Sequence, residues 1–191
     1  MSTKAIVIVP TQAEAAHMAG LGAGIVTGGV GMAETAITVA RLLRREPLPE
    51  MLILAGIAGT YGDSVGTGES VLVCCERTAD LGSLRDGTFE PLFVKEYLCP
   101  FAGEYSMFRS VKSNTVSTAG SPFADPRKLP DACRAEIENM EGAPFFALCL
   151  DAGVRFLELR TVSNRVGDPR SEWNIPLATQ NLARDLKILL G

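Results

Sequence analysis

The sequence is poor in the residues from which metal centres and disulfide frameworks are built. It contains a single histidine, and none of its five cysteines forms a Cys-x-x-Cys pair. Structural zinc sites need about four cysteine or histidine ligands at short spacings, and an odd number of cysteines cannot pair completely. We therefore expect no metal, no other cofactor, and reduced, mostly buried thiols of the kind found in cytoplasmic proteins.

Positive charge and long apolar runs are also scarce. The 18 lysines and arginines are outnumbered by 22 acidic residues, so the formal net charge is -4 and neither nucleic acid nor an anionic membrane would meet a basic surface. No apolar run approaches the ~20 residues that span a bilayer. The apolar run near the N-terminus is too short for a signal peptide. We expect a cytoplasmic protein with no nucleic-acid or membrane partner.

What the chain does contain is an alternation of strand-like and helix-like segments over 191 residues, enough for a single domain spanning residues 1–191. Strands are predicted at Ala5–Val9, Gly24–Thr27, Met51–Ala55, Glu69–Cys75, Val111–Thr118 and Val154–Val162. Helices are predicted after Thr11, from Met32 to Arg45, around Glu141, and from Asn174 to Leu190. This order predicts an α/β fold: a layered single domain with a mixed, mostly parallel sheet flanked by helices.

Residues 83–110 give a weak signal. Glycines and prolines interrupt the segment, and aromatic residues are spread through it without helical or strand periodicity. We expect an irregular excursion that serves as a lid or as a contact between subunits.

Two glycine turns are placed where backbone N–H groups can approach a ligand. Gly28-Gly29-Val30-Gly31 precedes a predicted helix, and Gly56-Ile57-Ala58-Gly59 follows a predicted strand. A third cluster, Gly20 to Gly24, resembles half of a dinucleotide-binding fingerprint. It follows a helix and precedes a strand, which is the wrong context for that motif.

Three polar residues lie at predicted strand ends or helix starts, where ligands collect in open α/β sheets. Glu14 follows the first strand, Glu141 lies at a helix start, and Asn164 ends a strand. Each also has an ordinary structural explanation. Glu14 can complete a capping box with Thr11, Glu141 can stabilise a helix dipole, and Asn164 can close a turn.

Together these residue types fit cleavage of an N-glycosidic bond. The Glu141 carboxylate can accept both hydroxyls of a cis-diol such as ribose, and Met140 beside it offers an apolar face to the sugar. The Asn164 amide can donate to a base, and a second carboxylate, Glu14, can take a proton from water. The transition state of such a reaction is oxocarbenium-like, with positive charge on the sugar.

The order of motifs resembles the nucleoside phosphorylase and nucleosidase superfamily. The motifs are the acid after the first strand, Gly28-Gly29-Val30-Gly31, Gly56-Ile57-Ala58-Gly59, Met140-Glu141-Gly142-Ala143 and Arg160-Thr161-Val162-Ser163-Asn164. This superfamily includes purine nucleoside phosphorylases, methylthioadenosine/S-adenosylhomocysteine nucleosidases and futalosine hydrolases. The segment Thr78 to Gly82, the Ser163-Asn164 ending and Trp173 are most similar to futalosine hydrolases, which implies the phosphorylase/hydrolase-like fold.

The resemblance implies a role for each matched residue. Glu14 matches the acid that activates water, and Met140 and Glu141 match the pair that binds ribose. Asn164 stands where adenine-specific nucleosidases carry an aspartate that assists the departing base. Further substrate contacts are implied for Gly56, Ile57, Ala58, Asn139 and Phe123, the last as an aromatic that stacks on the base.

Two departures from the family pattern concern the base and the nucleophile. Asn164 cannot supply an acidic proton, but its NH₂ group can donate to the ring nitrogen and carbonyl of a 6-oxopurine, which favours hypoxanthine. The amide can also flip, so the preference is not absolute. Phosphorylases surround phosphate with cations, whereas residues 5–40 and 46–76 contain no lysine or arginine. Water is therefore the expected nucleophile.

We expect a purine nucleosidase that releases hypoxanthine and a modified ribose from a futalosine-like nucleoside. The resemblance implies a role in menaquinone synthesis and a homodimer or larger homo-oligomer. Two alternatives within the family are a methylthioadenosine/S-adenosylhomocysteine nucleosidase and a purine nucleoside phosphorylase. A third is a nucleoside-binding protein that kept the pocket and lost the chemistry.

Overall fold

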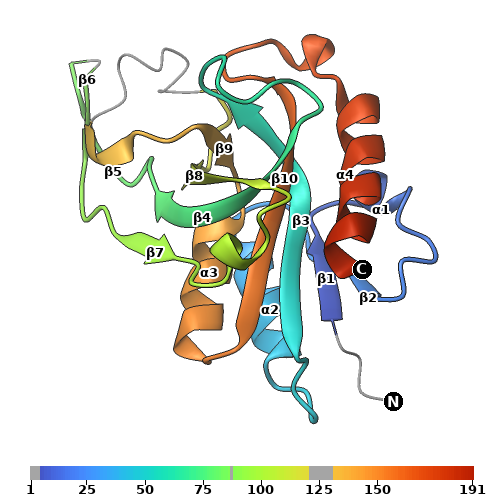
Figure 1. Cartoon of the computed structure of the whole chain (residues 1–191). Coiled ribbons are helices and arrows are strands. Elements are labelled where there is room, and N and C mark those ends of the chain that lie inside the picture. The colour runs from blue at the N-terminus through green and yellow to red at the C-terminus, as the bar shows by residue number, and fades with distance from the viewer. Residues whose placement is uncertain (1–4, 87, 121–130) are drawn as a thin grey trace.

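The computed structural model describes residues 5–86, 88–120 and 131–191, and one mixed sheet organises them (Figure 1). Its strands are β1 (Ala5–Val9), β2 (Gly24–Thr27), β3 (Met51–Thr60), β4 (Ser70–Thr78), β7 (Glu96–Leu98), β8 (Arg109–Thr115), β9 (Ile137–Asn139) and β10 (Arg155–Arg165). They pair in the order β10-β4-β8-β9-β3-β1-β2, with β7 on β4. Five of these strand pairs are parallel and three antiparallel, which confirms the mixed, mostly parallel sheet.

The sheet closes on itself through its longest strand. β10 pairs with β4 on one side and in parallel with β3 on the other, so β10, β4, β8, β9 and β3 form a ring. Outside this ring, β1 pairs in parallel with β3, and β2 pairs in parallel with β1. Because β1, β3 and β10 run in the same direction, their carboxyl ends lie at one edge of the sheet, where α/β proteins usually bind ligands.

Helices cover the sheet on both sides (Figure 1). They are α1 (Gln12–Ala15), α2 (Met32–Leu42), α3 (Gly142–Asp151) and α4 (Ile175–Leu190), with 3-10 turns at Ala102–Glu104, Asp131–Cys133 and Arg170–Glu172. α4 packs on β3 and β10, whereas α2 and α3 pack against one another. α2 ends three residues before the predicted Arg45. Within the described part of the chain, no helix is long and apolar enough to cross a bilayer.

The buried strands consist of uninterrupted apolar runs, without the alternation of apolar and polar residues seen in strands that have one exposed face. All of β1 and residues 52–55 of β3 are buried, as expected for parallel strands covered on both faces. Phe156 of β10 packs edge-on against two rings of α3, with centroid distances of 5.7 Å to Phe145 and 4.9 Å to Phe146. These contacts fix the position of α3, and with it the position of Glu141 immediately before the helix.

The third strand is longer than predicted. The sequence suggested an end at Ala55 followed by a glycine turn, but β3 continues through Gly56-Ile57-Ala58-Gly59 to Thr60. β10 pairs with it along its whole length, from Arg155 opposite Met51 to Arg165 opposite Thr60. The glycines here make space beside a paired strand rather than forming a turn.

The segment 83–110 is more regular than predicted. Its first part is a β-hairpin of β5 (Gly82–Arg85) and β6 (Thr88–Pro91), outside the main sheet. Its later part adds β7 to the edge of β4. Short strands of four and three residues are too brief for a periodic pattern to appear in the sequence.

Candidate active site

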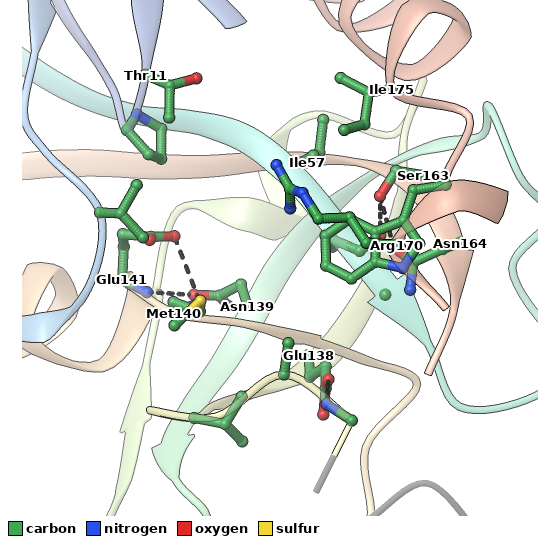
Figure 2. Close-up of a pocket in the computed structure, with 18 of the residues that line it drawn as sticks. Thr11, Ile57, Glu138, Asn139, Met140, Glu141, Ser163, Asn164, Arg170 and Ile175 are labelled. Carbon is green, nitrogen blue, oxygen red and sulfur yellow. Dashed lines mark hydrogen bonds between the residues drawn. The ribbon is translucent and has the colours of Figure 1, made fainter. Parts of the chain in front are cut away.

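A cavity of about 560 Å³ opens at the carboxyl ends of β1, β3 and β10. Its walls include residues from β3, β9 and β10, the segments after β1 and β9, and the loop between β10 and α4 (Figure 2). The candidates Glu14, Glu141 and Asn164, which are far apart in sequence, all line it. The structure therefore brings the three together around a single space.

Glu14 lies in the short helix α1 that follows β1, with only 4% of its surface exposed. Its Oε1 accepts a hydrogen bond from the backbone N–H of Ile57 (2.9 Å), and its Oε2 accepts one from the Thr11 hydroxyl (2.6 Å). Thr11 is also the helix N-cap and accepts from the Glu14 N–H, which is half of the predicted capping box. The Glu14 carboxylate bonds to the Thr11 hydroxyl and the Ile57 N–H instead of completing the box. Burial raises the pKa of Glu14 above 4.5, outweighing these hydrogen bonds and the attraction of Arg160.

Glu141 lies directly before α3 and is equally buried. Its Oε1 accepts from the backbone N–H of Gly31 (3.0 Å), so the Gly28-Gly29-Val30-Gly31 turn positions this carboxylate. Its Oε2 accepts from Arg160 Nη1 (3.2 Å). Met140 beside it lines the cavity, as the ribose-binding interpretation requires. Oε2 also accepts from the backbone N–H of Met140 (3.3 Å), so Oε1 is the oxygen that keeps a further acceptor position for a sugar hydroxyl.

Asn139 also borders the cavity, but its amide is used within the protein. Its Oδ1 accepts from the N–H groups of Glu141 (2.8 Å) and Gly142 (2.7 Å) and from Arg160 Nη2 (3.1 Å). Its Nδ2 donates to Ser113 Oγ (2.7 Å) and to the carboxylate of Glu76. These bonds fill the capacity of the amide, so Asn139 holds the start of α3 in place.

Arg160 is the largest omission from the sequence interpretation. It is completely buried, and its guanidinium binds the Glu158 carboxylate (2.7 Å) in addition to Glu141 and Asn139. A Cβ added to Gly56 would lie 2.5 Å from Arg160 Nη1 and 3.0 Å from Glu14 Oε1. Arg160 thus pairs with Glu141 and lies near Glu14, whose pKa it lowers by charge attraction. It stands in the quoted Arg-Thr-Val-Ser-Asn motif, but nothing in its spacing shows that it points inward.

Behind Arg160 lie two further carboxyl groups, Glu76 and Glu158, each fully buried. A Cβ added to Gly142 would approach Glu76 Oε1 to 2.2 Å and Glu158 Oε2 to 2.8 Å, so these oxygens face one another. Glu158 Oε2 has no hydrogen-bond partner within the described structure. Burial raises the pKa of both groups, and their mutual repulsion raises that of Glu158 further.

Asn164 is at the far end of the cavity from Glu141 (Figure 2). Its Oδ1 accepts from the Ser163 hydroxyl (2.7 Å), and its Nδ2 donates to the carbonyl of Arg165 (2.8 Å). The Ala58 carbonyl, 3.3 Å from Ser163 Oγ, is the alternative, more distant acceptor for the same hydroxyl hydrogen. These bonds orient the amide, and the second N–H of Nδ2 remains available to a ligand.

The other predicted contacts divide into three groups. Ile57 and Ala58 line the cavity, although the Ile57 N–H and carbonyl bond to Glu14 and Arg160. Gly56 lies behind the wall and contributes space. Phe123 lies outside the described residues. At the mouth, Trp173 stacks with the guanidinium of Arg170, 5.1 Å from its ring centroid.

The chain is similar to known proteins over most of its length. The sequence pattern of the phosphorylase superfamily matches residues 12–190. Futalosine hydrolase of Thermus thermophilus is 34% identical over 179 residues, covering 85% of this chain and 79% of the relative. Futalosine hydrolase of Acidothermus cellulolyticus is 32% identical over 180 residues, covering 84% and 72%.

Solved structures share the fold at low sequence identity. 5′-methylthioadenosine/S-adenosylhomocysteine nucleosidase from Helicobacter pylori superposes with a TM-score of 0.80 at 13% identity, over 99% of this chain and 98% of that one. Native futalosine hydrolase from the same organism gives 0.78 at 14% identity, over 98% of each chain. The family match spans nearly the whole length and the relatives align over most of theirs, and so the chain belongs to the phosphorylase superfamily.

Proposed function

We propose that the protein is a nucleosidase that hydrolyses the N-glycosidic bond of a purine nucleoside. The observation that carries this proposal is the convergence of Glu14, Glu141 and Asn164 on one cavity of about 560 Å³. The cavity has the size of a small-molecule site. The two relatives above, both futalosine hydrolases, support a futalosine-like 6-oxopurine nucleoside as substrate, with hypoxanthine and a modified ribose as products.

In this proposal the two carboxylates act on opposite parts of the reaction. Glu14, whose pKa is raised by burial, takes a proton from the attacking water. Glu141 accepts hydrogen bonds from the ribose hydroxyls and stabilises positive charge on the sugar as the bond to the base lengthens. Met140 covers the sugar. Such preorganised electrostatic contacts are typically worth ~3–4 kcal/mol each.

Asn164 receives the departing base. Its Nδ2 group donates toward the ring nitrogen and the carbonyl of a 6-oxopurine, where negative charge develops. The bond from Nδ2 to the Arg165 carbonyl, which can only accept, favours this orientation of the amide over the flipped one. That orientation supports hypoxanthine over adenine as the leaving base.

Water is the proposed nucleophile because the cavity offers little to a phosphate ion. Among the described residues that line it, Arg170 is the one cation, and it lies over Trp173 at the mouth. Arg160 behind the wall is bound to Glu158, Glu141 and Asn139 and has no free face for an anion. Phosphorolysis would require additional cations.

The test is to incubate the protein with futalosine, inosine and methylthioadenosine, with and without phosphate, and to separate the free bases by chromatography. Hypoxanthine release without phosphate is expected. Release of adenine alone would assign the protein to the methylthioadenosine/S-adenosylhomocysteine class, and dependence on phosphate would make it a phosphorylase. Binding without cleavage of any nucleoside would identify a binding protein.

We further propose self-association and a cytoplasmic location. The segment 83–110 and its flanks expose large apolar side chains, with exposed fractions of 89% for Phe93, 69% for Leu84, 61% for Met107 and 59% for Leu98. Apolar side chains gathered in this way favour contact with a second copy of the chain. Four of the five cysteines are buried as free thiols, which suits a reducing compartment.

A further inference from the structure

Glu138, on β9, is a carboxylate in the cavity wall to which the proposed reaction assigns no role. Only 5% of its surface is exposed, and it lines the cavity together with Asn164. A Cβ added to Gly59 would lie 3.4 Å from Asn164 Nδ2 and 3.5 Å from Glu138 Cγ. The two side chains therefore flank the same glycine, at the end of the cavity away from Glu141 (Figure 2).

The protein holds this carboxylate in place with hydrogen-bond donors. The Tyr61 hydroxyl donates to Oε2 (2.8 Å), and the backbone N–H of Gly120 donates to Oε1 (2.9 Å). Asn114 Nδ2 donates to the Tyr61 oxygen (3.2 Å), which directs the Tyr61 hydroxyl hydrogen toward Glu138. Burial raises the pKa of Glu138, while these two bonds favour its ionised form. Because a donor points at each carboxylate oxygen, the positions that Glu138 presents to the cavity are acceptor positions.

An acceptor beside Asn164 resolves an ambiguity that the amide leaves open. A 6-oxopurine carries a donor at N1 and an acceptor at O6, whereas adenine carries an acceptor at N1 and a donor at N6. An amide can serve either pattern by rotating, but an ionised carboxylate can only accept. Facing N1, it binds a 6-oxopurine and repels the lone pair of adenine.

We propose that Glu138 is a specificity-determining residue that accepts the N1–H of a 6-oxopurine while the remaining N–H of Asn164 is shared between O6 and N7. The inference rests on the proposed nucleosidase function and names the base that this site selects. Sites built around one hydrogen-bonding pattern reject mismatched ligands strongly, because the buried polar groups are left unpaired.

The rival interpretation is structural: Glu138 could serve only to tie Gly120 and Tyr61 to β9. The two interpretations differ in what they predict for different bases. A tether affects every ligand alike, whereas a base-recognising carboxylate affects only ligands that carry N1–H. The experiment must therefore compare ligands as well as variants.

The first test uses the wild-type protein and varies the base. Hypoxanthine, 1-methylhypoxanthine and adenine are titrated by calorimetry, with the fluorescence of Trp173, the single tryptophan, as a second readout. A hydrogen bond to a charged group corresponds to a loss of roughly 10- to 100-fold in affinity when N1–H is replaced by a methyl group. Equal affinity for hypoxanthine and 1-methylhypoxanthine would overturn the proposal without requiring any variant to fold.

The second test compares Glu138→Gln with Glu136→Gln. Glu136 is a carboxylate two residues away that accepts from the N–H of Lys112 and lies outside the cavity. Glu138→Gln is expected to lower kcat/KM for futalosine or inosine by roughly 10- to 100-fold. It should leave adenine affinity unchanged or higher. The Glu136→Gln control should leave both values unchanged.

An equal loss for both bases in Glu138→Gln would show a tether and overturn the proposal. Failure of the underlying function looks different, because the wild-type protein would then release no hypoxanthine from any nucleoside.

Discussion

Glu14 is buried and also accepts hydrogen bonds from nearby donors, and these two features have opposite effects on its pKa. Burial is the larger effect, so the pKa lies above the ordinary 4.5. A general base must be ionised to accept a proton. We therefore expect kcat/KM to rise with pH through this raised pKa, which places the acid limb of the pH–rate profile above pH 4.5.

Glu14→Gln is expected to remove this limb and to lower kcat by about 10²–10⁴-fold, the usual contribution of a positioned base. The variant keeps the shape of the side chain and the acceptor for the Ile57 N–H, so nucleoside affinity should be preserved within a few-fold. Steady-state kinetics and calorimetric binding measure the two quantities. Full turnover in Glu14→Gln would exclude Glu14 as the base.

The facing carboxyls of Glu76 and Glu158 predict an unusual pH dependence of stability. A carboxyl whose pKa is raised on folding binds its proton more tightly in the folded than in the unfolded state. Its contribution to stability is therefore fully present below pH 4.5, the ordinary value, and is lost as the pH rises through the raised pKa. The pKa of Glu158 is raised more than that of Glu76, and its Oε2 has no hydrogen-bond partner within the described structure, so Glu158 is the carboxyl that holds the proton.

Glu158→Gln should raise the free energy of unfolding at pH 8 by roughly 1–3 kcal/mol, the usual effect of satisfying a buried polar group. The new amide keeps its oxygen as the acceptor for Arg160 Nε, and its NH₂ group takes the place of the unpartnered Oε2, from which it can donate to Glu76 Oε1. It should also flatten the decline of stability as the pH rises above 4.5. Urea denaturation at several pH values measures both effects. A less stable variant with an unchanged pH dependence would contradict a shared proton.

At the scale of the element, β3 shows which parts of a strand the residue pattern can predict and which it cannot. Its buried start was predictable because an apolar run of five residues is typical of a covered strand. Its continuation was not, because glycines usually end strands, and the pairing with β10 that overrides this preference is a long-range contact. Arg160 and Glu138 were missed for the same reason. Their roles depend on the directions in which their side chains point, and these directions are set by the closed ring of strands.

Gly56 in β3 is expected to be essential because an alanine methyl would collide with Arg160 Nη1. Either Arg160 or Glu14 must move, so Gly56→Ala should lower kcat/KM by 100-fold or more and cost about 1–3 kcal/mol of stability. Gly62→Ala is the matched control, because its Cβ would meet nothing within 4 Å. Steady-state kinetics and thermal unfolding of both variants measure the difference. Unchanged activity in Gly56→Ala would mean that the positions of Arg160 and Glu14 beside Gly56 do not matter for catalysis.

At the scale of the whole molecule, the candidate catalytic groups and the exposed apolar side chains belong to different parts of the fold. The cavity lies at the carboxyl ends of β1, β3 and β10, whereas Leu84 belongs to the β5–β6 hairpin and Phe93 follows it. Such a division suits a fold in which the ring of strands carries the catalytic groups and the segment 83–110 contacts a second copy of the chain. The sequence indicated the insertion by its lack of periodicity but gave no measure of what it exposes.

Leu84→Ser combined with Phe93→Ser is expected to shift the protein from an oligomer toward the monomer, because each change removes apolar area from the proposed contact. Sedimentation velocity at several protein concentrations measures the shift. Ile188→Ser on α4 is the control, since that side chain is 54% exposed on another element and should not affect the mass. A wild type that is monomeric throughout, or a double variant that associates as strongly as the wild type, would place any contact between copies elsewhere and leave the cavity to act within one chain.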